Sequence, residues 1–282
     1  MYKNILIFFS ILFLGCANKI NVDKNIKETN TENYLIQKYQ ITKKALTKLN
    51  NNYYFYALDN NELSIYKLNK NYEINNKKTI PLLIDAQKLV SDNKNLYLIG
   101  YEEKKQKPIL IVLDKNLNII SQKFIGDRFD IPKGIITKPK ITILLLTYKN
   151  GADIKICNLK KCITYINPNN QLPKFIKRYN DGFLVVGSIQ DTQEDLFVAF
   201  IKNDKIIWQK RYDFGFSDNP TSIKIKNNQI IINVVSTDYM GADKYLTIVL
   251  DKNGKLIKKI KKIELKPLPI KFRTWINLKT NL

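Results

Sequence analysis

The chain has 282 residues, of which 44% are hydrophobic and 11% aromatic, enough apolar content for one or two folded domains. It carries 47 Lys and Arg against 25 Asp and Glu, a net charge of +22, and it contains no His. The missing His removes the commonest general base and metal ligand. The charge favours anionic partners, although the joint richness in Lys, Asn and Ile also fits a plain compositional bias.

An apolar run from Ile5 to Leu14 follows the basic start at Lys3. It is about half as long as the roughly 20 residues of a membrane-spanning helix, and it has the length of the core of a secretory signal. The run ends in Gly15-Cys16, which resembles the lipobox of bacterial lipoproteins. The resemblance implies a signal peptide over residues 1–15 and fatty acyl chains such as palmitate on Cys16. The other interpretation is an ordinary cleaved signal followed by an incidental Cys.

The residue after Cys16 is Ala17, not the Asp that often retains lipoproteins in the inner membrane, so the resemblance implies the outer membrane of the cell envelope. Phe13 and Leu14 depart from the usual lipobox residues. Loss of Lys3 with the signal leaves a net charge of +21, one less than the +22 of the full chain. At a membrane such a charge suits an anionic glycan or lipid surface, and the location argues against nucleic acid.

Polar residues dominate positions 16–33, which predicts a flexible tether between the lipid and the folded domain. A coil of this length spans roughly 20–25 Å. We expect the folded domain over residues 34–282. Its first predicted strand, Tyr34–Tyr39, is similar to the last strand of each later repeat, and it predicts closure of a ring by pairing with strands in the segment Pro269–Leu278.

A repeat follows the predicted tether. Pro81, Pro132, Pro173, Pro220 and Pro267 are separated by about the same distance, and each opens a block with two strongly apolar predicted strands. Tight turns rich in Asn, Asp and Gly recur with a similar spacing, and these residues tolerate the positive φ of hairpin turns. The apolar strand pairs are 53–58 with 63–68, 96–100 with 109–113, 141–147 with 154–157, 182–187 with 196–200, and 230–235 with 245–250.

Four short strands per block of about 45 residues are typical of β-propeller blades. The blocks resemble bacterial propeller repeats of the WD40-like or PQQ-like type, as in the turn followed by Ile206–Lys210. The resemblance implies an all-β propeller with five complete four-stranded blades and a composite sixth, or with five alone. An open β-sandwich fits the regular period less well. Because Trp208 and Trp275 are the only tryptophans, the regular tryptophans of quinone-binding propellers are missing and no cofactor is expected.

Cys157 and Cys162 flank a short polar segment that reads as a hairpin turn. Outside the cytoplasm such a pair can oxidise, and we predict a disulfide worth about 2 kcal/mol in so small a ring. A zinc or CxxC-type redox site is disfavoured by the spacing and by the lack of His and further thiols.

The alternation of strand direction sorts the loops of such a blade onto two faces. The loops from the second to the third strand, and from one blade to the next, share a face that we call the loop face; the Lys-rich turns from the third to the fourth strand lie opposite. Long loops on a rigid scaffold often bind partners, and aromatic residues anchor interfaces. In the other interpretation Asp and Gly only form turns, and Phe214 and Phe216 cap the core. The candidate partner-binding residues are Asp127, Arg128, Phe129, Asp130, Asp213, Phe214, Phe216, Asp218 and Tyr239.

Catalytic motifs are missing from the sequence, and we expect no catalytic residue and no metal site. Asp191, Glu194 and Asp195 could hold Ca²⁺ or act as a hydrolytic pair, but their spacing matches no calcium loop. The sequence therefore favours a membrane-anchored, non-enzymatic scaffold that binds other envelope proteins. The alternative is a surface propeller that binds or cleaves glycans, because aromatic side chains can stack on sugars.

Overall fold

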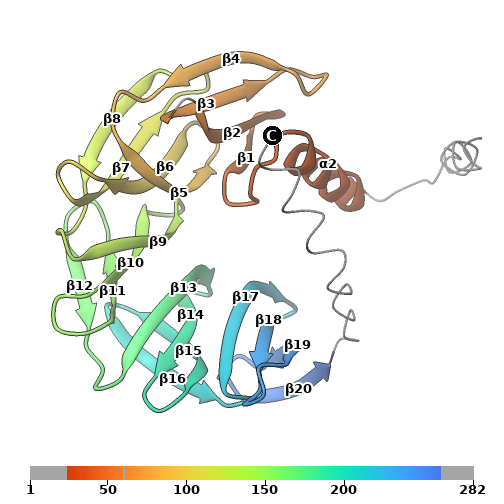
Figure 1. Ribbon diagram of the computed structural model, residues 1–282, viewed down its shortest axis with the longest axis vertical. Coiled ribbons are helices and arrows are strands. Elements are labelled where there is room, and N and C mark those ends of the chain that lie inside the picture. The colour runs from red at the N-terminus through yellow and green to blue at the C-terminus, as the bar shows by residue number, and fades with distance from the viewer. Residues whose placement is uncertain (1–23, 60, 262–282) are drawn as a thin grey trace, which may run out of the picture.

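A ring of four-stranded antiparallel sheets surrounds a central axis in the computed structural model, which describes residues 24–59 and 61–261 (Figure 1). The ring follows a helix, α2 (Lys24–Lys38). Within each sheet the strands pair in chain order, so every sheet is a meander with its first strand innermost. A single parallel bridge between Glu194 and Ser217 joins the last two sheets.

Five such sheets, here called blades 1 to 5, follow one another along the described chain. Blade 1 comprises β1 (Leu46–Leu49), β2 (Asn52–Asp59), β3 (Glu62–Leu68) and β4 (Ile74–Thr79). Blade 2 comprises β5 (Ile84–Ser91), β6 (Leu96–Glu102), β7 (Lys107–Leu113) and β8 (Ile119–Phe124). Blade 3 comprises β9 (Asp130–Ile136), β10 (Thr142–Thr147), β11 (Asp153–Cys157) and β12 (Cys162–Tyr165). Blade 4 comprises β13 (Asn170–Tyr179), β14 (Gly182–Gln190), β15 (Glu194–Lys202) and β16 (Lys205–Tyr212). Blade 5 comprises β17 (Ser217–Lys226), β18 (Gln229–Thr237), β19 (Asp243–Leu250) and β20 (Leu256–Lys261).

The arrangement confirms the predicted propeller of four-stranded blades. Each predicted apolar pair forms the second and third strands of one blade. In blades 2, 3 and 4 these strands are apolar along most of their length because a neighbouring blade covers each face of the sheet. Separate apolar clusters fill the spaces between consecutive blades, from Tyr54 and Leu98 between blades 1 and 2 to Val186 and Ile232 between blades 4 and 5.

Proline marks one structural position in three successive blades. Pro132, Pro173 and Pro220 lie in the innermost strands β9, β13 and β17, and each directly precedes an extra residue that forms a β-bulge. In β5 the same position is held by Ala86, also followed by a bulge, whereas Pro81 precedes the strand. Proline lacks a backbone donor and is tolerated in sheets at edges and bulges, so the recurring proline marks the inner strand of blades 3, 4 and 5.

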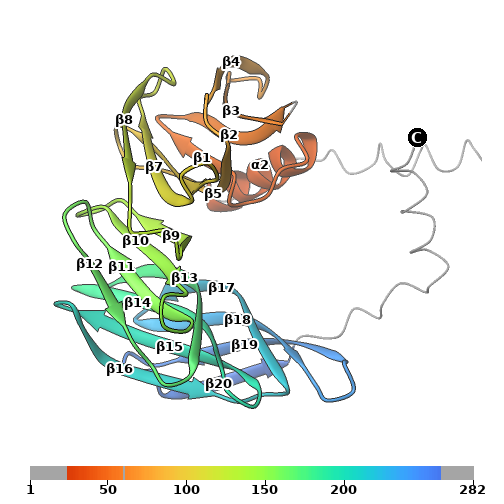
Figure 2. The same ribbon diagram turned by 60° about the vertical axis from the view of Figure 1, so that its left-hand side comes forward.

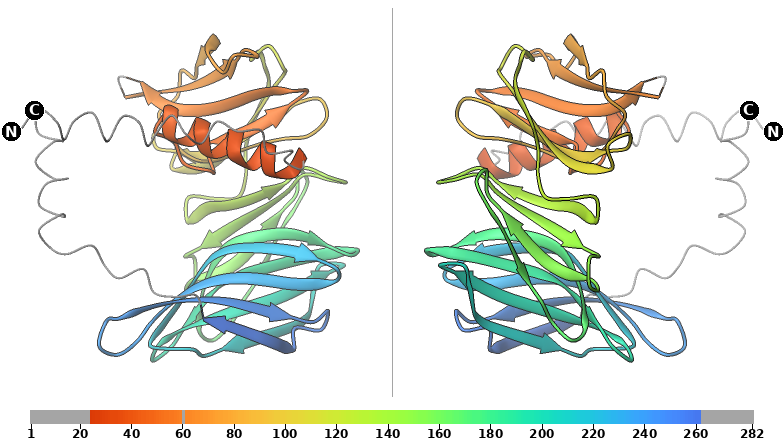
Figure 3. Two further views of the ribbon diagram at one scale, coloured as in Figure 1. Left: turned by 90° about the vertical axis from the view of Figure 1, so that its right-hand side faces the viewer. Right: turned by 90° about the vertical axis from the view of Figure 1, so that its left-hand side faces the viewer.

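The first element differs from the prediction. Tyr34–Tyr39 is not a blade strand, because helix α2 runs to Lys38. The same helix includes residues 24–33, which the sequence assigned to the flexible tether. The helix lies along the flank of blade 1 (Figure 3). Leu35 is fully buried against Tyr53 and Phe55, and the ring of Tyr39 stacks on Phe55 at 4.7 Å between centroids. A helix satisfies its backbone hydrogen bonds internally, so it covers the end blade without needing a pairing partner.

The ring does not close over the described residues. An open sector separates blade 5 from α2 and blade 1 (Figure 1). Accordingly β18 alternates between buried and half-buried positions, whereas β14, covered on both sides, is buried almost throughout. The expected composite sixth blade rests on Pro269–Leu278, which lies outside the described residues. In the described part of the chain, no helix has the length and apolar character needed to cross a membrane.

Candidate functional site

Side-chain contacts confirm that the loops sorted to the loop face lie together. The Tyr239 hydroxyl, in the loop between β18 and β19, donates to Oε1 of Gln193 at 3.2 Å, in the corresponding loop of blade 4. The rings of Tyr239 and Phe216 lie 5.2 Å apart between centroids, and Phe216 belongs to the connection between blades 4 and 5. One predicted aromatic pair is therefore built from two loops and is tied to a third.

This group projects into solvent. Tyr239 is 78% exposed, Met240 is 92% exposed and Phe216 is 45% exposed. The loop between β18 and β19 extends beyond its neighbours (Figure 2). Its backbone is held by Asp238, whose carboxylate accepts the backbone N–H groups of Met240 and Ala242 at 3.0 Å. A rigid loop that exposes aromatic and thioether side chains suits a contact with another macromolecule. We call Phe216, Tyr239 and Met240 the aromatic knob.

An arginine braces the base of the aromatic knob. The Arg211 guanidinium, at the end of β16, donates from Nη1 and Nη2 to the two oxygens of Asp191, at 2.6 and 3.0 Å, and from Nε to Asp195. This pairing holds the pKa of Asp191 well below its usual range. Glu194 is engaged by the hydroxyls of Ser188 and Ser217. The acidic residues considered for Ca²⁺ or hydrolysis thus have partners within the protein.

Three carboxylates gather beneath the aromatic knob. Asp195, Asp213 and Asp218 each place an oxygen within 4.8 Å of the others. Asp218 is fully buried; its Oδ2 accepts the N–H of Phe214 at 2.7 Å, and its Oδ1 has no hydrogen-bond partner among the described residues. Burial, with smaller contributions from Asp195 and Asp213, raises the pKa of Asp218 to about 6. These oxygens are the ligand type that a hard cation prefers, although Arg211 already occupies Asp195.

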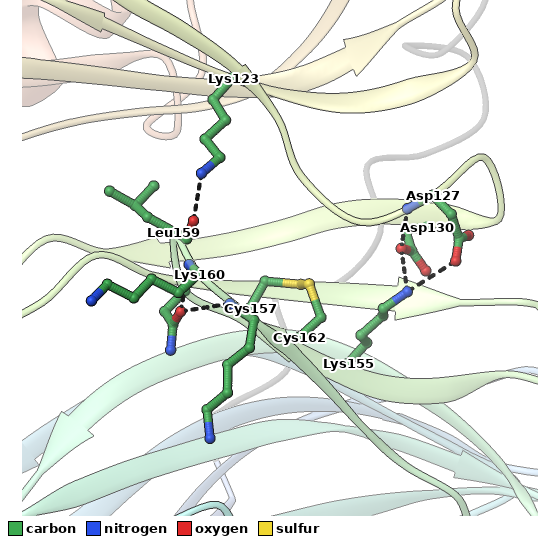
Figure 4. Close-up of a disulfide and its surroundings, with 10 residues drawn as sticks. Lys123, Asp127, Asp130, Lys155, Cys157, Leu159, Lys160 and Cys162 are labelled. Carbon is green, nitrogen blue, oxygen red and sulfur yellow. Dashed lines mark hydrogen bonds and ion pairs between the residues drawn. A yellow bond between two sulfur atoms is a disulfide. The ribbon is translucent and has the colours of Figure 1, made fainter.

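The predicted loop between blades 2 and 3 divides into structural and exposed residues. Asp130 is fully buried and binds the Lys155 ammonium at 2.7 Å, and Asp127 binds the same ammonium at 3.1 Å (Figure 4). Arg128 lies over the exposed ring of Phe129, 4.8 Å from its centroid. The prediction that all four residues face a partner is wrong for Asp130, because its charge is neutralised inside the blade. The prediction that Asp218 faces a partner is also wrong, because its side chain is fully buried.

The sequence left two roles open for Phe214 and Phe216, partner binding or capping of the core, and the structure places the two residues differently. Phe214 packs against the cluster between blades 4 and 5, and its ring stacks parallel to Tyr212 at 6.4 Å. Phe216 instead faces solvent beside Tyr239. Capping of the core therefore holds for Phe214 alone. Sequence reasoning did not select Gln193, Arg211 or Met240; the position of Met240 in the same polar loop as Tyr239 was the available signal.

The cysteine pair lies where the hairpin prediction placed it. Cys157 ends β11, Cys162 begins β12, and the two residues are directly opposite in the register. Their sulfur atoms are 2.00 Å apart, at disulfide distance (Figure 4). Oδ1 of Asn158 accepts the N–H groups of Lys160 and Lys161 at 2.7 and 2.9 Å, which fixes the turn. Cys16 lies outside the described residues.

Comparisons with known proteins support the fold. Protein-family models and curated proteins gave no match to the chain. Among solved structures, Kuenenia stuttgartiensis hydrazine synthase aligns with a TM-score of 0.57 at 10% identity, over 81% of this chain and 68% of that one. The WD40 domain of Toxoplasma gondii coronin aligns at 0.52 and 8% identity, over 77% and 58%. Dihydro-heme d1 dehydrogenase NirN aligns at 0.51 and 11% identity; this alignment covers 76% of this chain and only 45% of that chain. At these identities the likeness shows a β-propeller and no activity.

Proposed function

We propose that this protein is an envelope lipoprotein that holds a protein-binding propeller at a membrane through a lipid on Cys16. The anchor is supported by the sequence: a short apolar run ending in Gly15-Cys16 resembles a lipobox. Several acyl chains on one Cys give stable anchoring, whereas one chain gives only marginal binding. Ala17 supports the outer membrane as the location.

The aromatic knob carries the proposal of protein binding. It combines two neighbouring exposed side chains of the β18–β19 loop, Tyr239 and Met240, with Phe216 of the connection between blades 4 and 5. The salt bridges of Arg211 to Asp191 and Asp195 hold the loop of Gln193, to which Tyr239 is hydrogen-bonded. Exposed aromatic residues on a rigid support lose little conformational entropy when they bind. A non-enzymatic scaffold fits the engagement of Asp191 and Asp195 by Arg211 and of Glu194 by two serines.

Photocrosslinking in cells tests the binding surface. A photoreactive amino acid replaces Met240 in the full chain, and a matched control carries it at Ile120, which is 56% exposed on the outer strand β8. We expect one reproducible protein adduct from position 240 and not from position 120. Phe216→Ser together with Tyr239→Ser should strongly reduce that adduct, while membrane fractionation stays unchanged. Failure to form an adduct at 240, or the same adducts from both positions, would contradict the proposal.

A glycan ligand is the second candidate function, favoured by the exposed rings of Phe216 and Tyr239, which lie side by side, and by the exposed carboxylate of Asp213 in the same connection as Phe216. Sugars stack on aromatic faces and hydrogen-bond to carboxylates. Purified protein is screened against envelope polysaccharides for binding and for release of reducing ends. Saturable binding that Tyr239→Ser abolishes would support this function over protein binding, and its absence would remove it.

A further inference from the structure

A second feature lies at the axis of the ring, away from the aromatic knob. Lysines from three adjacent inner strands converge there: Lys88 of β5, Lys133 of β9, and Lys174 and Lys177 of β13, with Lys44 just before β1. Lys88, Lys133 and Lys174 are half-buried. Lys133 and Lys174 are the extra residues of the bulges after Pro132 and Pro173, and bulges commonly re-aim a side chain.

The charges of these lysines influence one another across the axis. Burial, with smaller contributions from Lys177 and Lys44, lowers the pKa of Lys88 to about 8. Burial also lowers the pKa of Lys133; the charge of Lys44 adds to the effect, and the charge of Asp85 acts against it. Burial lowers the pKa of Lys174. The charge of Glu194 raises this pKa, and the charges of Lys133 and Lys44 lower it further. The charge of Lys44 therefore lowers the pKa of lysines in three different blades.

A pocket of about 710 Å³ opens at the axis beside this cluster, on the side where the first and second strands of each blade connect. Its volume lies in the range of small-molecule sites. The one carboxylate in its lining, Asp92, already accepts backbone N–H groups of its own turn and the hydroxyl of Tyr97. The charged residues in the lining are Lys48, Lys88, Asp92, Lys138, Lys177 and Arg178.

Little in the protein neutralises the cluster. Among the described residues, no carboxylate oxygen lies within 4.0 Å of the ammonium groups of Lys88, Lys133 or Lys177. Lys174 donates to a neutral acceptor, Oδ1 of Asn219, at 2.6 Å. Burying charge without a partner is costly. An anion at the axis would supply the missing partner for several lysines at once.

We propose that this axial pocket binds a compact anion with several phosphate groups. Lysines act as point charges toward phosphate oxygens, and cations converging from several strands match a ligand with several negative charges better than a single carboxylate. The ligand would enter from the side of the pocket, opposite to the loop face. The inference goes beyond the proposed function, since it needs neither the lipid nor the aromatic knob.

Calorimetric titration of the full chain in detergent with inorganic tripolyphosphate tests the site. We expect saturable binding with one site per chain, which weakens as salt rises. Lys88→Met and Lys177→Met each remove a cation from the pocket lining and should each lower the affinity about tenfold or more, the loss of one charged contact. Lys115→Met and Lys252→Met remove the same charge from exposed turns and are the matched controls. Lys88→Met without ligand should melt no lower than wild type, which separates loss of binding from misfolding.

Proton linkage gives a second readout. The charged groups facing Lys88 are Lys44 and Lys48 from blade 1, Lys138 from blade 3, Lys177 and Arg178 from β13, and Asp92 from its own blade. Because the pKa of Lys88 is about 8, a bound anion should raise that pKa and binding should take up protons at pH 8. The affinity should fall as pH rises from 7 to 9, and Lys88→Met should flatten this dependence.

The outcomes separate the sources of phosphate. In protein carrying Cys16→Ala, which removes the proposed lipid, vesicles of phosphatidylcholine with cardiolipin, a lipid with two phosphates, that bind the protein with Lys88 and not its Lys88→Met variant would identify a lipid headgroup. Binding of tripolyphosphate alone would identify a soluble ligand. An absence of binding at low salt, or equal weakening by the Lys115→Met and Lys88→Met variants, would overturn the proposal. Crosslinking at Met240 is unaffected in either case, so the two proposals fail independently.

Discussion

Asp130 shows how one residue can be mistaken for a binding site. In the sequence it ends an acidic, aromatic loop, but the chain turns it inward, where it meets Lys155 of β11. The residue two positions before a blade's inner proline is buried in each of blades 3, 4 and 5: Asp130, Gln171 and Asp218. Sequence alone did not reveal this because the burial follows from the position of the bulge and not from residue type.

The buried pair predicts a large and local stability effect. Asp130→Asn leaves the ammonium of Lys155 with Asp127 alone, and breaking a buried pair costs about 3–5 kcal/mol. Asp59→Asn breaks the exposed pair with Lys77, and an exposed pair contributes far less to stability than a buried one. Urea unfolding of both variants measures the difference. Equal losses would mean that Asp130 does not bear a buried charge.

The buried carboxylate of Asp218 predicts a pH dependence of the opposite sign to that of an ordinary Asp. Its pKa of about 6 lies above the unfolded value near 3.8, so the folded state holds the proton more tightly. The stability from this proton is fully present below about pH 4 and is lost as pH rises through 6. Asp218→Asn should therefore be more stable than wild type at pH 7, by about 3 kcal/mol, and about as stable at pH 4. Thermal unfolding across this range is the measurement, and parallel curves for the two proteins would contradict it.

Among the elements, the sequence period and the apolar runs predicted the strands of the blades well, but they predicted the first element of the folded domain wrongly. The pairs of apolar strands were found because sheets covered on both faces must be apolar throughout. Tyr34–Tyr39 was wrongly predicted as a strand because its apolar residues also suit one face of a helix. So short a run does not distinguish the period of a strand from the period of a helix. Packing of Leu35 against Phe55 decides for the helix.

The hairpin of β11 and β12 predicts a redox-dependent stability. If Cys157 and Cys162 are oxidised in the native protein, reduction should lower the free energy of unfolding by about 2 kcal/mol. A Cys157→Ala, Cys162→Ala double variant should not respond to reductant, which controls for effects elsewhere. Urea unfolding with and without reductant provides the comparison. Two free thiols at these positions in protein isolated without reductant would show that the pair is not oxidised.

At the scale of the whole molecule, the described chain is a five-bladed propeller whose ring stays open beside α2 (Figure 1). The fold was predictable from repeats, because each blade is one supersecondary unit with its own period. The aromatic knob was predictable only in part, since it is assembled by loops of two blades that are far apart in sequence. The lysine cluster at the axis was not predicted, since only the arrangement of the inner strands of several blades around the axis brings its members near one another.

We propose that a lipid on Cys16 holds this propeller at a membrane, and removal of that cysteine tests the proposal directly. Cells expressing the wild type or Cys16→Ala are labelled with an alkyne analogue of palmitate and then fractionated. We predict that the wild type takes up the label and sediments with the membranes, and that the variant is unlabelled and is released into the soluble fraction. A Cys16→Ala protein that remains in the same membrane fraction would contradict the account.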